Sequence, residues 1–175
     1  MIKENVQEAI NGQIQAELQS AYQYLAYAAW FDSKNLKGFS HWMRIQWREE
    51  IEHAMKFYDH ILRRDGDVDL KDVNKPSVDI ETPEECFENV LAQEQNVTKK
   101  IHKLYDLAKN ENDYPLQTLL HWFIDEQVEE EEAAQEILEK LQLIGDHGPN
   151  LYLLDQELGQ RPANPDEGGN GESGP

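Results

Sequence analysis

Several acidic side chains and one histidine stand at helical positions where metal binding would explain them. In "REEIEH", Glu50 and His53 are three positions apart, so that they share one face of a helix. Further along, "HWFIDEQVEEEEAAQEIL" has Asp or Glu at six of the eight positions 125–132, among them Glu130. Oxygen ligands with one imidazole suit a hard or borderline divalent metal, whereas a structural zinc site prefers thiolates and imidazoles. The single cysteine, Cys86, excludes a four-cysteine metal module.

Four long helices are predicted to position these side chains. Apolar residues recur at steps of three and four, the pattern of amphipathic helices, and strand-like alternation is absent. The predicted helices cover about residues 5–33, 37–64, 83–109 and 113–143. This pattern predicts an all-α fold.

Two short motifs predict where the third and fourth helices begin. In "TPEE", Thr82 is the expected N-cap, Pro83 takes the first helical position and Glu85 closes a capping box. In "NDYP", Asp113 is the expected cap of the fourth helix.

A polar connection, residues 65–81, joins the second and third helices. If extended it spans about 55 Å, whereas a helix of 28 residues is only about 42 Å long. The connection can therefore cross the whole bundle, which would make the second and third helices parallel. We expect a four-helix bundle with a long crossover over residues 1–145, a short fifth helix from "LYLLDQEL" within 146–161, and a disordered Pro/Gly-rich tail over 162–175.

Each long helix has a row of apolar residues on its core-facing side, called here its core stripe. Near the middle of every helix, a polar residue interrupts this stripe. The interruptions are Glu17, Glu50 with His53, Glu94, and Gln127 with Glu130. In an antiparallel hairpin, residues equidistant from the turn lie side by side. Glu50 follows Glu17 by 33 positions, and Gln127 follows Glu94 by the same 33. The interruptions are therefore expected to meet in one layer.

A single polar residue in a core stripe has a simpler explanation, because it can fix the register of packing. Four buried carboxylates at one level are different, since each costs several kcal/mol or takes up a proton. Their four negative charges, beside a neutral His53, would be balanced by two divalent cations.

The sequence resembles the bacterial-type non-haem ferritins over about residues 5–160. The stretches that carry the resemblance are "QAELQSAYQY", "REEIEH", "LAQEQNVTKKI", "NDYPLQTLLHWFIDEQVEEEE" and "LYLLDQEL". Ferritin-like di-iron proteins are themselves the known example of such a carboxylate layer in a bundle. The resemblance implies a ferroxidase that oxidises Fe(II) with O2 or H2O2. It also implies a 24-subunit cage that stores ferric oxyhydroxide and has the fifth helix at its four-fold axes.

The resemblance also implies a di-iron centre in each subunit. The implied ligands are Glu17, Glu50 and His53 for the first iron, and Glu94 and Glu130 for the second. Glu50 would bridge the two irons, and Gln127 would lie beside the second.

A third iron site is implied next to this centre. Its residues would be Glu49, Glu126, Glu129 and Glu130; the alternative is that the first three form only a solvated acidic face. Tyr24 and Trp122 lie near the centre in the family and could supply an electron, or they could be plain core aromatics.

The sequence departs from three related families. Bacterioferritins carry a second Glu-x-x-His where this chain has Gln127 and Glu130, and their haem-ligating methionine is replaced by Ile51, so no haem is expected. Rubrerythrin-like peroxidases need four cysteines for their second iron domain. The DNA-protecting mini-ferritins lack the fifth helix.

Charge and hydropathy limit the partners. With 35 acidic and 16 basic residues, the net charge of −19 repels nucleic acid and anionic membranes and attracts cations. No run approaches membrane-spanning length, so we expect a cytoplasmic protein. Two alternative functions stay open: a non-catalytic acidic bundle that sequesters metal, and a haem-free bacterioferritin-like di-iron oxidase.

Overall fold

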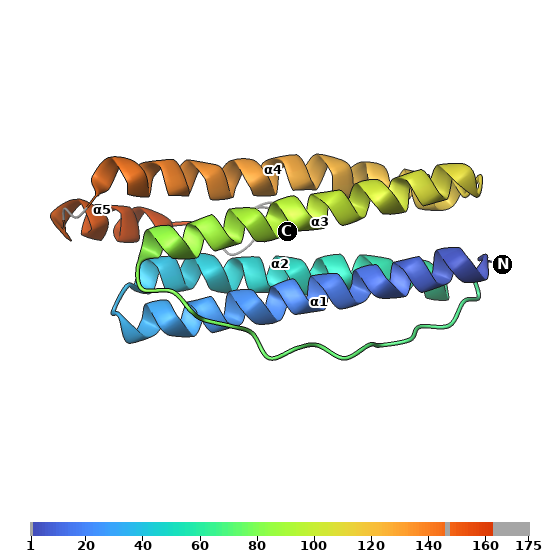
Figure 1. The fold of residues 1–175 in the computed structure, drawn as a ribbon, viewed down its shortest axis with the longest axis horizontal. Helices are drawn as coiled ribbons and strands as arrows, with labels where there is room; N and C mark the ends of the chain where they lie inside the picture. The colour runs from blue at the N-terminus through green and yellow to red at the C-terminus, as the bar shows by residue number, and fades with distance from the viewer. Residues whose placement is uncertain (1, 146–147, 163–175) are drawn as a thin grey trace, which may run out of the picture.

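The computed structural model describes residues 2–145 and 148–162, which form five helices and no strand. The helices are α1 (Glu4–Ser33), α2 (Lys37–Leu62), α3 (Pro83–Asn110), α4 (Tyr114–Ile144) and α5 (Gly148–Leu158). The first four lie alongside one another in an elongated bundle, with α5 folded against one end (Figure 1). The predicted fold class is confirmed. The expected disordered tail lies almost entirely outside the described residues. None of the helices in the described ranges has the length and apolar character needed to cross a membrane.

Two tight turns set the pairing of the long helices. Asn35 and Asn112 have φ values of 60° and 55° and connect α1 to α2 and α3 to α4. Asparagine tolerates this left-handed conformation better than most residues do. Each turn reverses the chain, so that both pairs are antiparallel hairpins.

The apolar core of the bundle is divided into two clusters. One cluster includes Phe31 and Phe87 and lies toward the end that carries α5. The other includes Ile10 and Leu116 and lies toward the opposite end. The predicted polar layer separates the two clusters.

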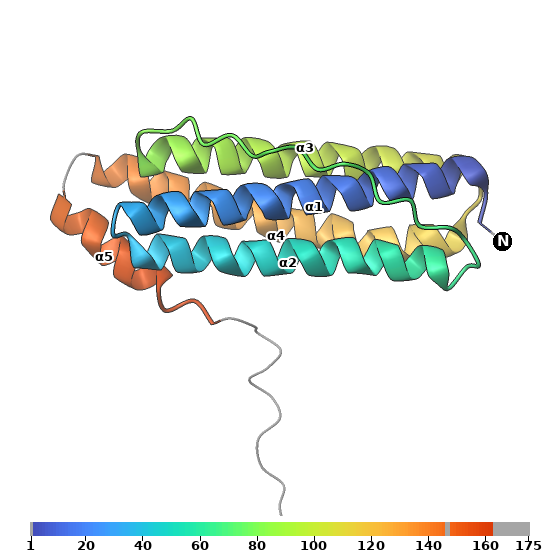
Figure 2. The ribbon, with the colours of Figure 1, turned by 90° about the horizontal axis from the view of Figure 1, so that it is seen from below.

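The connection between α2 and α3 runs the full length of the bundle, as Figures 1 and 2 show. The helices α2 and α3 are therefore parallel, as the length of the connection predicted. Asn11 on α1 donates to the carbonyl oxygen of Asp67 and accepts from the backbone N–H of Asp69. Gln19 both donates to the backbone carbonyl oxygen of Asn74 and accepts from its backbone N–H. The connection is thus held in extended form by side chains of α1.

These anchoring amides recur at every fourth position of α1. The amides are Gln7, Asn11, Gln15, Gln19 and Gln23. Four residues of helix rise about 6 Å and two residues of extended chain rise about 6.6 Å, so the two periods nearly match. The ladder of amides therefore fits the extended connection along most of its length.

The predicted caps are present, with one correction. Asp113 accepts from the N–H of Leu116 at 3.1 Å and caps α4, and Thr82 accepts from the N–H of Glu85 at 3.2 Å. The side chain of Glu85, however, accepts from the N–H of Glu81 and not from that of Thr82. The expected reciprocal capping box is therefore wrong in its second half: Glu85 binds the chain one residue earlier.

The helix α5 supplies the N-terminal cap of α2. Oδ1 of the buried Asp155 accepts from the N–H groups of Gly38 at 2.8 Å and Phe39 at 3.0 Å. A carboxylate at this end also interacts favourably with the helix dipole. The side chain of Leu36, at the N-cap position itself, makes no capping bond. A distant helix thus satisfies the free amides of α2 and is fixed to it.

Gly38→Ala is expected to detach α5 from α2. The new methyl group would overlap the backbone carbonyl of Asp155, which no side-chain rotation can relieve. With a cost of about 1–3 kcal/mol for such overpacking, amide hydrogen exchange in residues 148–161 should become about tenfold faster or more. Gly12→Ala is the matched control, because a Cβ there meets nothing within 4 Å. Equal exchange rates in Gly38→Ala and wild type would contradict the role assigned to this contact.

Candidate metal centre

The polar interruptions of the four core stripes meet in a single buried layer. Every member is at most 7% exposed to solvent. The members are Glu17 from α1, Gln46, Glu50 and His53 from α2, Glu94 from α3, and Gln127 and Glu130 from α4. Apolar clusters on both sides of the layer keep these groups away from bulk water.

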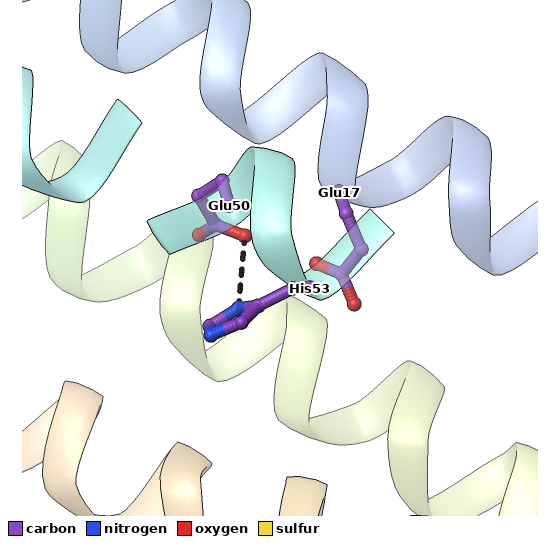
Figure 3. Close-up of side chains that lie close together, drawn as sticks. All are labelled: Glu17, Glu50 and His53. Atoms are coloured by element: carbon purple, nitrogen blue, oxygen red, sulfur yellow. Dashed lines mark ion pairs between the residues drawn. The ribbon is translucent and has the colours of Figure 1, made fainter. Parts of the chain in front are cut away.

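Glu17, Glu50 and His53 converge from two neighbouring helices (Figure 3). Each offers a ligand atom within 4.8 Å of the other two, and Nδ1 of His53 is 3.5 Å from Oε2 of Glu50. Gln13 donates to Oε1 of Glu17 at 2.8 Å. Oε2 of Glu17 and Oε2 of Glu50 are buried without a hydrogen-bond partner. Unsatisfied buried carboxylate oxygens are costly, and a cation between them would satisfy both.

Glu94 lies in the same layer but is held by hydrogen bonds. Oε1 accepts from the hydroxyl of Tyr24 at 2.5 Å, and Oε2 accepts from Nε2 of Gln127 at 3.3 Å. Gln127 also donates to the backbone carbonyl of Glu94 at 3.2 Å. Neither compact group of possible ligand atoms within the described residues includes Glu94. Its carboxylate would have to turn from these partners to bind a metal fully.

Glu130 belongs to a second group of possible ligand atoms, together with His53 and Glu126. Nε2 of His53 is 3.9 Å from Oε1 of Glu126. Oε2 of Glu130 accepts from Nε2 of Gln46 at 2.6 Å. His53 therefore lies between two sets of carboxylates, with one ring nitrogen toward each.

Burial raises the pKa of every carboxyl group in the layer. The pKa of Glu17 rises to about 7, chiefly because its charged form is desolvated and also because Glu94 repels it. Burial and then repulsion from the other carboxylates raise the pKa of Glu50 and Glu130 well above the ordinary range. Burial also raises the pKa of Glu94. The metal-free layer therefore holds protons that a divalent cation would displace.

His53 behaves in the opposite sense. Burial lowers its pKa to about 4, helped by the positive charge of Lys56. The imidazole is therefore neutral at physiological pH and has a lone pair for a metal. A neutral imidazole among carboxyl groups is a donor set that fits a hard or borderline divalent metal.

Comparisons with known proteins identify the family of this chain. Residues 7–144 match the family described as ferritin-like domain. The chain belongs to the ferritin family. It is 40% identical to a bacterial non-heme ferritin of Bacteroides fragilis over 92% of this chain and all of that one. A bacterial non-heme ferritin of Staphylococcus aureus is 37% identical over 92% of this chain and 97% of its own length.

Solved ferritin structures share the fold of this ferritin. An open pore ferritin from the archaeon Archaeoglobus fulgidus is 48% identical, covers 93% of this chain and all of its own, and has a TM-score of 0.91. A humanized archaeal ferritin gives a TM-score of 0.92 at 48% identity, covering 94% of this chain and all of its own.

The six carboxylates of residues 125–132 do not share one environment in this ferritin. Glu130 faces the layer, Glu126 and Glu131 are half-buried, and the other three are exposed. Glu131 accepts a hydrogen bond from Thr98 at 2.5 Å, so it is not simply a solvated carboxylate.

The residues expected at a third site lie next to this layer. Burial and repulsion from Glu129 and Glu49 raise the pKa of Glu126, which indicates that the three carboxylates are close together. Glu49 is bound by Arg161 at 3.0 Å, and Glu129 is exposed. Glu49, Glu126 and Glu129 thus form a row of carboxylates that leads outward from the buried layer, and we call this row the acidic path.

The two aromatic residues differ from each other. Tyr24 is fully buried, and its hydroxyl contacts Glu94; burial and the nearby carboxylates raise its pKa, so it keeps its proton. Trp122 is 38% exposed, with its ring 5.4 Å from that of His53 and Lys56 above its face. Trp122 is therefore not the plain core aromatic that one interpretation expected.

Two polar residues near the centre had no role in the sequence analysis. Gln46 lies one turn before Glu50 on the core-facing stripe of α2, so its helical position could have indicated it. Arg161 follows α5 and reaches both Gln46 and Glu49. No periodic pattern marks Arg161, because its location depends on where α5 docks.

Proposed function

We propose that this ferritin is an iron-storage ferroxidase that binds Fe(II) in the buried layer and oxidises it to Fe(III). The observation that carries the proposal is the pair of unpartnered buried oxygens on Glu17 and Glu50 beside a neutral His53. Two Fe(II) ions would bring four positive charges, which match the carboxylates of Glu17, Glu50, Glu94 and Glu130.

In the proposed oxidation the electrons come from Fe(II), and the carboxyl groups of the layer supply protons. Each Fe(II) gives one electron, and two electrons with two protons reduce O2 to H2O2, or H2O2 to two waters. The carboxyl groups of Glu17 and Glu50, whose pKa values are raised, release protons when iron binds. Tyr24 orients Glu94 by donating its hydroxyl hydrogen bond to that carboxylate. The surrounding apolar clusters keep solvent away from the reacting ions.

We propose further that the second iron is in transit. Glu94, Gln127 and Glu130 offer it only oxygen atoms, with no second imidazole, and carboxylates change their mode of binding easily. Glu49, Glu126 and Glu129 continue the acidic path outward and would form the third site. Fe(III) would leave along this path for storage.

Storage requires an assembly, and we propose the cage of 24 subunits. Large apolar side chains stand exposed at the end of the bundle where α5 lies: Leu143 is 87% exposed, Leu153 65% and Tyr152 62%. Such a group of apolar side chains is expected to be covered by other subunits. The similarity to ferritins over nearly the whole chain supports this arrangement.

The transit proposal predicts that Glu49→Ala/Glu126→Ala/Glu129→Ala slows the recovery of rapid oxidation. After a first Fe(II) addition and a waiting period, wild type should regain its fast phase in stopped-flow absorbance. The triple variant should regain it about tenfold more slowly or worse, because the outer carboxylates no longer accept Fe(III). An effect of 10–100-fold is typical for removing groups around a metal site.

A charge-matched control separates transit from net charge. Glu52→Ala/Asp125→Ala/Glu132→Ala removes three exposed carboxylates from the same two helices. It should recover as wild type does. If both triple variants recovered like wild type, the outer carboxylates would be a solvated face only.

The function itself is tested by anaerobic loading. Protein with two Fe(II) per subunit is mixed rapidly with O2, and absorbance and O2 consumption are followed. A ferroxidase consumes O2 within seconds and forms Fe(III), whereas a metal-sequestering bundle oxidises iron no faster than buffer. A haem-free di-iron oxidase would also react rapidly, but it would keep its iron and not accept a second addition.

A further inference from the structure

Arg161 is fixed at both ends against α2. Nε2 of His41 donates to its backbone carbonyl at 2.8 Å, so that this nitrogen carries the proton. Its guanidinium binds both carboxylate oxygens of Glu49, at 3.0 and 3.2 Å, and lies 5.2 Å from the ring centroid of Trp42. The side chain is 28% exposed. One guanidinium nitrogen contacts Glu49 and the other bonds Gln46, so this partly buried arginine is better defined than an ordinary surface ion pair.

The guanidinium also reaches the buried layer through one amide. Arg161 donates to Oε1 of Gln46, and Nε2 of Gln46 donates to Oε2 of Glu130 at 2.6 Å. A guanidinium only donates hydrogen bonds, so it forces the oxygen of Gln46 outward and the NH2 group toward Glu130. The orientation of a proposed iron ligand therefore depends on a residue that follows α5.

The same guanidinium occupies the place of a cation beside Glu49. It neutralises one of the carboxylates on the acidic path, and its positive charge also favours the ionised form of Glu130. A metal ion bound by Glu49 would compete with Arg161 for the same oxygens. If the guanidinium leaves, the segment after α5 loses its side-chain contacts with Gln46 and Glu49 of α2.

We propose that Arg161 is a positioning residue that couples metal binding at Glu49 to the docking of α5. It holds Gln46 and Glu130 in place while Glu49 is free of metal, and metal at Glu49 displaces it. Since coupling is reciprocal, metal weakens the docking of the segment after α5, and loss of Arg161 strengthens metal binding. The inference rests on the proposed role of Glu49 in the third site.

The binding test uses Zn²⁺, which cannot be oxidised, on the assembled protein. Calorimetric titrations compare wild type, Arg161→Gln, Arg161→Lys and Glu49→Gln. The weakest class of Zn²⁺ sites should bind about tenfold more tightly in Arg161→Gln than in wild type, a typical size for coupling between sites. In Glu49→Gln this class of sites should be absent. Arg161→Lys should be intermediate, because it keeps the charge but cannot bind Glu49 and Gln46 through two separate nitrogens. Arg44→Gln, which breaks the exposed pair with Asp32 and makes the same charge change, is the control and should match wild type.

The docking test uses amide hydrogen exchange in residues 155–161. In wild type, Zn²⁺ should speed up this exchange several-fold. In Arg161→Gln the exchange should already be fast and should not respond to Zn²⁺. A residue that only anchored the chain would give fast exchange in the variant but no response to Zn²⁺ in wild type.

Two results would overturn the inference: equal Zn²⁺ binding by Arg161→Gln and wild type, or exchange in wild type that ignores Zn²⁺. Unchanged Zn²⁺ binding by Glu49→Gln would also overturn it, because no metal would then compete for that carboxylate. Neither readout involves oxidation. A ferritin that bound Zn²⁺ as described but failed to oxidise Fe(II) would contradict the proposed ferroxidase and leave the coupling standing.

Discussion

Glu50→Ala and His53→Ala are expected to abolish rapid Fe(II) oxidation while the helical fold survives. Both side chains interrupt the core stripe of α2 and converge with Glu17. Loss of outer groups at a metal site typically costs 10–100-fold, so loss of a direct ligand should slow the first turnover by about 100-fold or more. Stopped-flow absorbance at two Fe(II) per subunit measures the rate, and circular dichroism reports the fold.

The fold should survive because the metal-free layer opposes folding. Glu50 is buried among carboxylates that repel it, and removing it relieves this repulsion. Glu52→Ala is the matched control, since Glu52 is exposed on the same helix. Oxidation of the first two irons at the wild-type rate in either site variant would show that the ligands lie elsewhere.

The metal-free protein is expected to lose thermal stability as the pH rises from 6.5 to 8.5. A carboxyl group whose pKa is raised by folding stabilises the folded state fully below its unfolded pKa. That stability disappears as the pH rises through its folded pKa. For Glu17, with a pKa of about 7, the loss over this window is on the order of 1 kcal/mol, and Glu50 and Glu130 add to it.

The range from pH 6.5 to 8.5 excludes most of the opposing effect of His53 on the free energy of unfolding. Its pKa is lowered to about 4, so its effect on stability has the opposite sign and is confined to the region below about pH 6.5. Above that pH the carboxyl groups of the layer make the largest contribution. Between about pH 4.5 and 6.5 the effect of His53 offsets only part of the effect of the carboxyl groups.

Calorimetric unfolding with and without Zn²⁺ measures this dependence. The midpoint in EDTA should fall by several degrees, since 1 kcal/mol corresponds to about 2–4 °C for a chain of this size. Glu17→Gln should flatten the curve and Glu52→Gln should not. With Zn²⁺ the trend should reverse, because protons compete with metal at low pH. A midpoint in EDTA that is constant or rises with pH would contradict the protonated layer.

The layer of carboxylates could be predicted because helix geometry leaves little freedom. Short turns at Asn35 and Asn112 fix the levels within each hairpin, and the length of the crossover fixes the direction of α3. Positions equidistant from a turn must then meet. The predicted meeting of Glu17 with Glu50 is of this kind.

Contacts that depend on a single rotamer or on distant chain segments could not be predicted in this way. Asp155 caps α2 and Arg161 binds Glu49 only because α5 docks where it does. The hydrogen bond from Tyr24 to Glu94 depends on the rotamers of both residues. The amide ladder is different, because its amides recur every four residues on α1 and this period is visible in the sequence.

The claim that the buried layer is the iron site is tested most directly by locating iron. Crystals loaded anaerobically with two Fe(II) per subunit can be measured at the iron absorption edge. Two anomalous peaks are expected within the layer: one between Glu17, Glu50 and His53, and one between Glu50, Glu94 and Glu130. Peaks found only among exposed carboxylates, with the layer empty, would contradict the account.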